Sequence, residues 1–109
     1  MLPANTLEEQ MLDCDAGDAQ ACLNAGKTYS AKVYKAKSNN KENVASKVAA
    51  LYKRSCHFGD AEGCRAYAMQ YTSDTDKDPH KNAAYYFQKA CDGGDYTACT
   101  MLKMMPTQE

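Results

Sequence analysis

Six cysteines are the residues of this chain whose type and spacing most clearly predict chemistry. They form three pairs, and the two members of each pair are separated by seven residues: Cys14 and Cys22, Cys56 and Cys64, Cys91 and Cys99. The segments CDAGDAQAC, CHFGDAEGC and CDGGDYTAC all place Gly-Asp at the third and fourth positions after the first cysteine. Three such copies in 109 residues indicate an internal repeat.

Paired cysteines can form disulfides, hold a metal ion or exchange electrons, and their spacing distinguishes these roles. Zinc sites favour cysteines about two to four residues apart, and redox centres use Cys-x-x-Cys. Neither spacing occurs here. The repeat therefore favours one disulfide within each pair, with a metal site or reduced buried thiols as the alternatives. Disulfides would place the chain in an oxidising compartment, either the periplasm, the cell exterior or a eukaryotic equivalent.

Other reactive residues occur without the neighbours that catalysis requires. Ser38 and Lys41 match the Ser-x-x-Lys motif of penicillin-binding proteins and β-lactamases, but the companion motifs Ser-Asp-Asn and Lys-Thr-Gly are absent. His57 and His80 have no evident nucleophile between them. Adaptable packing, rather than copper binding, accounts for Met101, Met104 and Met105. We therefore expect no catalytic residue, no metal ligand and no cofactor.

The elements that must position the cysteines are predicted to be helices. Seventeen alanines, three valines and no isoleucine favour helix over strand. In the first copy, Gly17 can end one helix in the left-handed conformation, and Asp18 can cap the start of the next. One cysteine then lies in the last turn of the first helix and the other in the first turn of the second. A tight turn would bring their Cα atoms within the ~4.4–6.8 Å that a disulfide requires.

The same logic predicts one all-α domain, residues 1–109, made of three helical hairpins. The hairpins span about 6–36, 44–72 and 80–105, and a polar loop spans about 37–43. Thr6-x-x-Glu9 is typical of a capping box that opens the first helix. The individual helices are expected near 6–16, 19–36, 44–58, 61–72, 80–92 and 96–105.

The segments CLNAGKTY and CRAYAMQY, which follow the first two turns, resemble the second helix of the Sel-one-like repeat family. The third copy departs from this pattern, since it runs into Met-Met-Pro without the glycine or tyrosine. The cysteine pairs resemble the cysteine-rich bacterial branch, in which each hairpin is stapled across its turn. The resemblance implies a short α-solenoid of tetratricopeptide-like hairpins.

Such a solenoid implies a non-catalytic module that binds another protein on an extended face. A sharper hypothesis is a periplasmic inhibitor or immunity protein that captures a secreted toxic enzyme, a role of some small proteins of this type. Two alternatives follow from the same resemblance: a cell-wall or β-lactam-directed hydrolase, and an assembly factor of the mitochondrial intermembrane space.

The charge distribution suggests where a partner would dock. Residues 1–26 hold five acids and no base, whereas residues 27–54 hold seven lysines and Arg54 against Glu42 alone. The basic segment is either a docking surface for an acidic protein or a solvated face. Most tyrosines are expected between helices. The candidate partner-binding residues are Lys32, Tyr34, Lys35, Lys47, Lys53, Tyr86 and Tyr96.

The remaining features narrow the class of partner. A net charge of -1 argues against whole-molecule attraction to nucleic acid or anionic lipid. No apolar run approaches the ~18 residues of a membrane span. The start, MLPANTLEEQ, lacks the features of a signal peptide, so we expect either a mature secreted or periplasmic form or a targeting signal of an unrecognised type. We expect a monomer or a heterocomplex with the protein partner.

Overall fold

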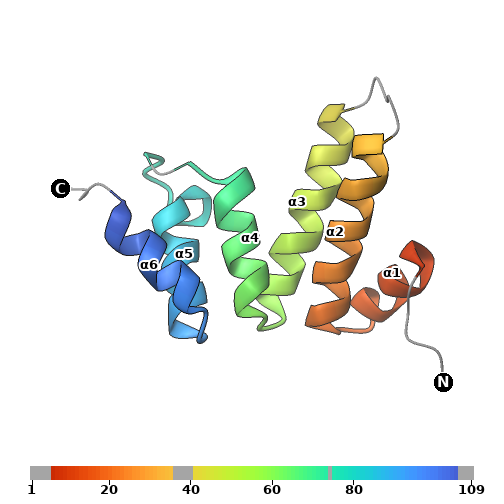
Figure 1. The fold of residues 1–109 in the computed structure, drawn as a ribbon, viewed down its shortest axis with the longest axis horizontal. Coiled ribbons are helices and arrows are strands. Elements are labelled where there is room, and N and C mark those ends of the chain that lie inside the picture. Colours follow the sequence, from red (N-terminus) through yellow and green to blue (C-terminus); the bar gives the residue numbers. More distant parts are fainter. Residues whose placement is uncertain (1–5, 36–40, 74, 106–109) are drawn as a thin grey trace.

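The computed structural model describes residues 6–35, 41–73 and 75–105, and this part of the chain is helical (Figure 1). In chain order its elements are α1 (Leu7–Asp15), α2 (Ala19–Lys35), α3 (Lys41–His57), α4 (Ala61–Tyr71), a short 3-10 helix η1 (Pro79–Lys81), α5 (Ala83–Asp92) and α6 (Tyr96–Met104). The all-α fold predicted from the sequence is confirmed.

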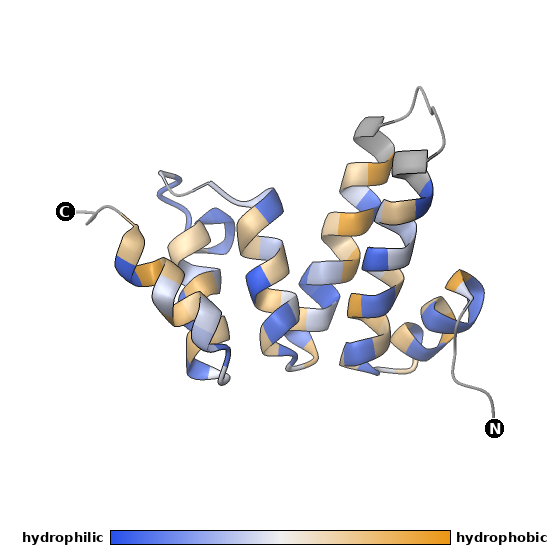
Figure 2. Ribbon diagram, in the orientation of Figure 1, coloured by the Kyte–Doolittle hydropathy of each residue, from blue (hydrophilic) through white to orange (hydrophobic). Residues whose placement is uncertain are grey.

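The helices form a row of three hairpins, α1–α2, α3–α4 and α5–α6, as Figure 1 shows. Each α-helix packs against the next one along the chain, and α2 also contacts α4. The body measures 47 × 35 × 20 Å along its principal axes. Hydrophilic and hydrophobic residues are interleaved along the helices (Figure 2), as expected of helices that bury one side and expose the other. The result is a short solenoid-like fold.

The three hairpin turns share one backbone geometry. Gly17, Gly59 and Gly94 have φ angles of 100°, 102° and 103°, a conformation that a side chain disfavours. The Gly17 N–H donates to the Cys14 carbonyl at 2.9 Å, and the Asp18 N–H donates to the Asp13 carbonyl at 3.1 Å. This bonding pattern ends a helix, and it recurs at the other two turns.

An aspartate begins the second helix of each hairpin, as the sequence predicts. The Asp18 carboxylate accepts a bond from the Ala21 N–H at 3.2 Å. The Asp60 carboxylate accepts from the Glu62 N–H, and the Asp95 carboxylate accepts from the Ala98 N–H. Each aspartate thus satisfies a backbone donor that the helix itself leaves unpaired.

Three disulfides join the cysteine pairs that the spacing favours. They connect Cys14 to Cys22, Cys56 to Cys64 and Cys91 to Cys99, with Cα separations of 4.5, 4.5 and 4.8 Å. All three cross a hairpin turn, and the turns lie along the same edge of the molecule, the lower edge in Figure 1. The structure describes no free cysteine.

Small residues set the spacing between helices. Gly26 of α2 lies against Tyr52 of α3 so closely that a Cβ at position 26 would stand 2.5 Å from the ring carbon Cε1. Gly63 of α4 lies in the same way against the side chain of Ser55. The buried residues Leu23, Val48 and Tyr52 form the core cluster between the first two hairpins.

Two helix starts differ from the sequence prediction. α3 begins at Lys41 rather than near 44, so part of the expected loop at 37–43 is helical, while residues 37–40 lie outside the described part. The expected helix at 80–92 is divided: residues 79–81 form η1, and α5 begins after Asn82. The Asn82 side chain accepts a bond from the Ala84 N–H at 2.8 Å, and this local cap fixes the start of α5.

Candidate binding surface

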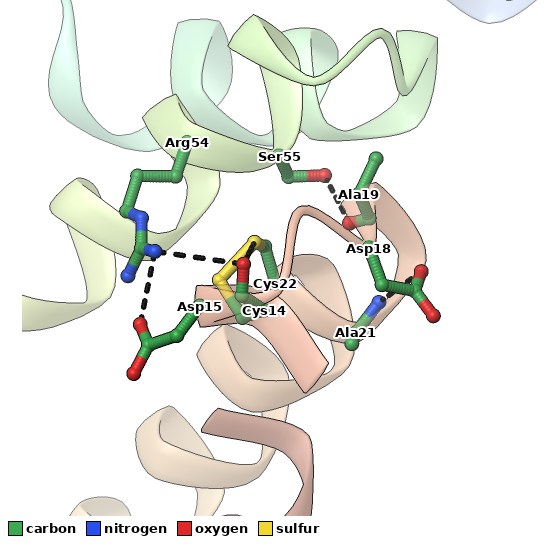
Figure 3. Close-up of a disulfide and its surroundings, with 8 residues drawn as sticks. All are labelled: Cys14, Asp15, Asp18, Ala19, Ala21, Cys22, Arg54 and Ser55. Atoms are coloured by element: carbon green, nitrogen blue, oxygen red, sulfur yellow. Dashed lines mark hydrogen bonds and ion pairs between the residues drawn. A yellow bond between two sulfur atoms is a disulfide. The ribbon is translucent and has the colours of Figure 1, made fainter. Parts of the chain in front are cut away.

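Ion pairs between hairpins engage some basic residues of the segment 27–54. Arg54 of α3 lies 2.9 Å from the Asp15 carboxylate, and it also donates to the Cys14 carbonyl at 3.5 Å (Figure 3). Beside it, the buried Ser55 hydroxyl donates to the Ala19 carbonyl at 2.9 Å. These bonds fasten the second hairpin to the turn of the first.

Lys27 is also engaged inside the protein. Its amine lies 2.6 Å from the Glu62 carboxylate and so connects α2 to α4. The fold therefore divides the basic segment into two groups. Lys27 and Arg54 hold hairpins together, and they are not available to a partner in the same way as the other lysines.

Three lysines of the segment have no carboxylate partner among the described residues: Lys32, Lys47 and Lys53. The Lys47 amine stands over the Tyr29 ring, 5.9 Å from its centroid, and the Lys53 amine stands at the same distance from the Tyr67 ring. Lys32 and Lys47 are exposed, and Lys53 is half-buried. Ammonium groups held over aromatic faces keep their charge while their side chains lose freedom.

Aromatic rings form a continuous row across the second and third hairpins. Tyr52 of α3 lies 6.2 Å from Tyr71 of α4, and Tyr71 lies 6.2 Å from Tyr67, centroid to centroid. Tyr67 meets Tyr86 of α5 edge-on at 4.8 Å. The row continues through Tyr85 to His80. It begins at the core between α2, α3 and α4 and ends beside η1.

Burial governs the ionisation of three phenols in this row. It raises the pKa of Tyr52, to which the nearby Glu62 charge adds. It likewise raises the pKa of Tyr71, with a smaller contribution from Tyr52. The pKa of Tyr86 is raised by burial first, and then by neighbouring tyrosines and Asp78. These phenols are therefore protonated at neutral pH and can donate hydrogen bonds.

Tyr86, expected at the partner-binding surface, is a core residue. Only 4% of it is exposed, and its hydroxyl donates to the His80 carbonyl at 3.1 Å. Ala83, Tyr86, Phe87 and Ala90 are all buried, and these positions lie on one face of α5. Its neighbour Tyr85, on the other side of that helix, is 37% exposed.

The remaining tyrosine and lysine candidates do not form one site. Tyr96 is 81% exposed, but it begins α6 in the third hairpin, away from the lysines of α2 and α3. The side chains of Tyr34 and Lys35 lie outside the described residues. Of the seven predicted partner-binding residues, the structure brings Lys32, Lys47 and Lys53 to adjoining helices.

Sequence reasoning missed the partly exposed tyrosines beside these lysines. Tyr29, Tyr67 and Tyr71 were expected between helices, and they do pack there, yet each keeps part of its surface exposed. These three rings pack against the buried cluster, whereas the Tyr52 ring lies within it. The i, i+4 spacing of Tyr67 and Tyr71 on a helix next to the lysine-rich segment is the signal that could have revealed them.

The residues considered for catalysis are not brought together. His57 ends α3 at the turn edge, whereas His80 lies in η1 at the opposite edge (Figure 1). Ser38 and the side chain of Lys41 lie outside the described residues. Within the described ranges, no group of three or more histidine, cysteine, aspartate or glutamate residues could hold a metal ion. Met101 and Met105 pack against the third-hairpin core, and Met104 is 80% exposed.

A partly buried ion pair connects the second and third hairpins. The Arg65 guanidinium donates to the Asp95 carboxylate at 2.7 Å, and the Asp95 side chain is only 11% exposed. Burial alone would raise the pKa of Asp95. The hydrogen bond from Arg65, the backbone N–H groups of Ala98 and Thr97 and the Arg65 charge outweigh this effect and lower the pKa below its usual value.

Comparison of the chain with protein-family models, curated proteins and solved structures found no match. No described helix combines the length and the apolar character that crossing a membrane requires. Three intrachain disulfides in so small a chain point to an oxidising environment.

Proposed function

We propose that this protein is a non-catalytic protein-binding module of the Sel-one-like repeat type, acting in the periplasm or outside the cell. The observation that carries the proposal is the set of lysines that have no carboxylate partner in the described part of the chain, two of them held over partly exposed tyrosine rings on α2 and α4. The complementary partner is a protein with an acidic surface.

The shape of the molecule supports binding to a protein. A row of hairpins presents several helices side by side, and such rows serve as extended binding faces. Tyrosine is enriched at the energetic centres of interfaces, because its ring contributes area and its hydroxyl contributes a hydrogen bond. Tyr29, Tyr67 and Tyr71 offer both, with Lys47 and Lys53 directly beside them.

The disulfides support the proposed compartment. Each bridge joins residues eight positions apart, and closing so short a loop contributes about 2.5 kcal/mol in the chain-entropy model. The net stability of a whole domain is about 5–15 kcal/mol. Three bridges are therefore comparable with the stability of the fold, which would be at risk in a reducing cytosol.

The sharper form of the proposal is an inhibitor or immunity protein that captures a secreted toxic enzyme. Stapled hairpins hold their surface residues in place before the partner arrives. Preorganisation of this kind reduces the conformational entropy lost on binding, which favours tight complexes. A protein that must neutralise a toxic enzyme requires such affinity.

The test is capture of a partner from periplasmic and culture-medium extracts under non-reducing conditions. The immobilised native protein is compared with the same protein after complete reduction and alkylation of its cysteines. We expect one protein to be retained in stoichiometric amount by the native form only, and its enzymatic activity to fall to zero when one equivalent of this protein is added. Equal retention by both forms, or no retention, would contradict the proposal. A retained protein whose activity is unchanged would contradict the inhibitor form of it.

A further inference from the structure

Several partly exposed side chains surround the core between the first two hairpins. Tyr29 of α2, Val44 of α3, and Tyr67 and Tyr71 of α4 all pack against the cluster of Leu23, Val48 and Tyr52. None of the four is fully covered. They share one buried base, and the ring contacts between Tyr67 and Tyr71 and between Tyr71 and Tyr52 connect the two α4 tyrosines to it, so we treat the four together as one patch. With the two lysines above its rings, the tyrosine–lysine patch comprises Tyr29, Val44, Lys47, Lys53, Tyr67 and Tyr71.

The patch contains tyrosine hydroxyls that can donate hydrogen bonds. The Tyr86 hydroxyl is engaged by the His80 carbonyl. By contrast, in the part of the chain that the structure describes, no protein group is bonded to the hydroxyls of Tyr29, Tyr67 and Tyr71. Burial raises the pKa of Tyr71, so this phenol remains a donor at neutral pH. Phenol donors beside two ammonium groups are suited to carboxylate oxygens.

The charges around the patch limit which anions fit it. Glu62 borders the patch through Tyr52, but its carboxylate is paired with Lys27. At the far end of the aromatic row, Asp78 lies close enough to Tyr86 to raise the pKa of that phenol. The patch is therefore electropositive over α3 and bordered by an acid beyond Tyr86. A long polyanion would reach Asp78 at that border, where Lys77 and Lys81 are also exposed, whereas a short acidic segment would stay over the lysines of α3.

The type of basic residue in the patch also decides which anion it would bind. Arginine is the residue that best matches phosphate, because its planar fork donates two bonds at once. Both arginines of this chain are occupied, Arg54 by Asp15 and Arg65 by Asp95. Lysines and tyrosines alone, with the apolar Val44 packed on the same core, favour carboxylates spaced by apolar side chains over phosphate groups.

We propose that the tyrosine–lysine patch binds an acidic peptide segment of the protein partner. Carboxylates of that segment pair with Lys47 and Lys53, and an apolar side chain between them packs on Tyr67 and Tyr71. This inference rests on the proposed function and adds to it the site and the chemistry of the partner.

The probe is a water-soluble synthetic peptide of alternating glutamate and alanine with a central leucine. It is titrated into the full, oxidised protein while backbone amide and tyrosine ring signals are followed by NMR. We expect saturable shifts at Tyr29, Tyr67 and Tyr71 and along α3 near Lys47. The same peptide with lysine in place of glutamate should produce none, and inorganic tripolyphosphate should bind more weakly than the acidic peptide.

Charge reversal supplies the matched comparison. In the Lys47→Glu/Lys53→Glu variant we expect affinity for the acidic peptide to fall about tenfold or more, since each reversal removes an ion pair and adds repulsion. The control is Lys89→Glu/Lys103→Glu, which changes the net charge equally on exposed residues of the third hairpin. Its affinity should stay within about twofold of the native value, an expectation for rim charges far from a site. Circular dichroism and disulfide mapping establish that both variants fold.

Three outcomes would overturn the inference. They are the absence of saturable shifts, shifts clustered away from the patch, and equal weakening of the two double variants. Stronger binding of tripolyphosphate than of the acidic peptide would assign the patch to a phosphate ligand instead. A partner that is captured by the native protein and retained undiminished by the Lys47→Glu/Lys53→Glu variant would leave the proposed function standing and contradict this site.

Discussion

The three capping aspartates provide an internal comparison for the link between the second and third hairpins. Asp18, Asp60 and Asp95 occupy the same place in the three turns, and each accepts a backbone N–H at the start of a helix. Asp95 alone of the three also accepts the Arg65 guanidinium, at 2.7 Å. Replacing each aspartate by alanine therefore separates the contribution of the cap from that of the ion pair.

The expected magnitudes follow from these contacts. Loss of an aspartate cap costs about 1 kcal/mol, which we expect for Asp18→Ala and Asp60→Ala. Asp95→Ala loses in addition a charge-assisted hydrogen bond. We place this bond at about 1.5 kcal/mol, the low end of its range, because the Arg65 side chain is 26% exposed. The free energy of unfolding should therefore fall by about 2.5 kcal/mol in Asp95→Ala.

The ion pair also gives the stability a dependence on pH. The pKa of Asp95 is lowered in the folded protein, so in acid the unfolded state takes up a proton more readily than the folded state. The contribution of Asp95 is fully present above the unfolded pKa of about 3.9, and it is lost as the pH falls through the lower folded pKa. Arg65→Ala removes the hydrogen bond and the charge of Arg65, which both lower this pKa, and leaves the backbone N–H groups of Ala98 and Thr97, so its stability should decline less steeply in acid.

Urea unfolding of the oxidised protein, followed by circular dichroism at several pH values, measures these effects. A double-mutant cycle between Arg65 and Asp95 should return a coupling of about 1 kcal/mol or more, while the cycle between Arg65 and Asp60 should return none within error. Equal losses in the three aspartate variants, or an acid dependence unchanged by Arg65→Ala, would refute the assigned role of this pair.

Three further predictions concern packing, redox chemistry and catalysis. Gly26→Ala should lower the free energy of unfolding by about 1–3 kcal/mol, because the Cβ of the alanine would collide with the Tyr52 ring. Helix propensity alone would raise stability by about 1 kcal/mol. A variant more stable than the native protein would therefore refute the close packing of Gly26 against Tyr52. Under limiting reductant, the bridge Cys91–Cys99 should open first, since both its cysteines are partly exposed and the other four are 5% exposed or less. Alkylation of the released thiols, followed by mass-spectrometric mapping, measures the order of opening. Labelling of Cys14 or Cys56 before Cys91 would contradict this prediction. Hydrolysis of a chromogenic β-lactam should stay at background in the native protein and in Ser38→Ala; turnover that disappeared in Ser38→Ala would contradict the non-catalytic proposal.

The sequence sufficed for features that depend on neighbours along the chain. The Gly-Asp turns, the caps and the cysteine pairs are local, so the spacing of residues such as Cys14, Gly17 and Asp18 already determines their geometry. The predicted helix order followed, since turns and caps fix where helices end and begin. The start of α5 was misplaced because the Asn82 cap was not recognised as a competing helix start.

The candidate binding surface depends on contacts between segments that are distant in the sequence, and sequence reasoning did not predict these contacts. The basic segment 27–54 was treated as a unit, but Asp15 and Glu62 come from other helices and engage Arg54 and Lys27. The consecutive pair Tyr85 and Tyr86 gave no sign of which ring would face α4. Only the rotation of α5 against its neighbours assigns Tyr86 to the core.

Association kinetics of the captured partner test the central claim most directly. The rate constant is measured at low and at physiological ionic strength for the native protein, for Lys47→Glu/Lys53→Glu and for Lys89→Glu/Lys103→Glu. Attraction between Lys47 and Lys53 and an acidic partner predicts fast association that slows as salt screens the charges, and slower, less salt-dependent association in Lys47→Glu/Lys53→Glu alone. An association rate and salt dependence that are the same in all three proteins would contradict binding through the tyrosine–lysine patch.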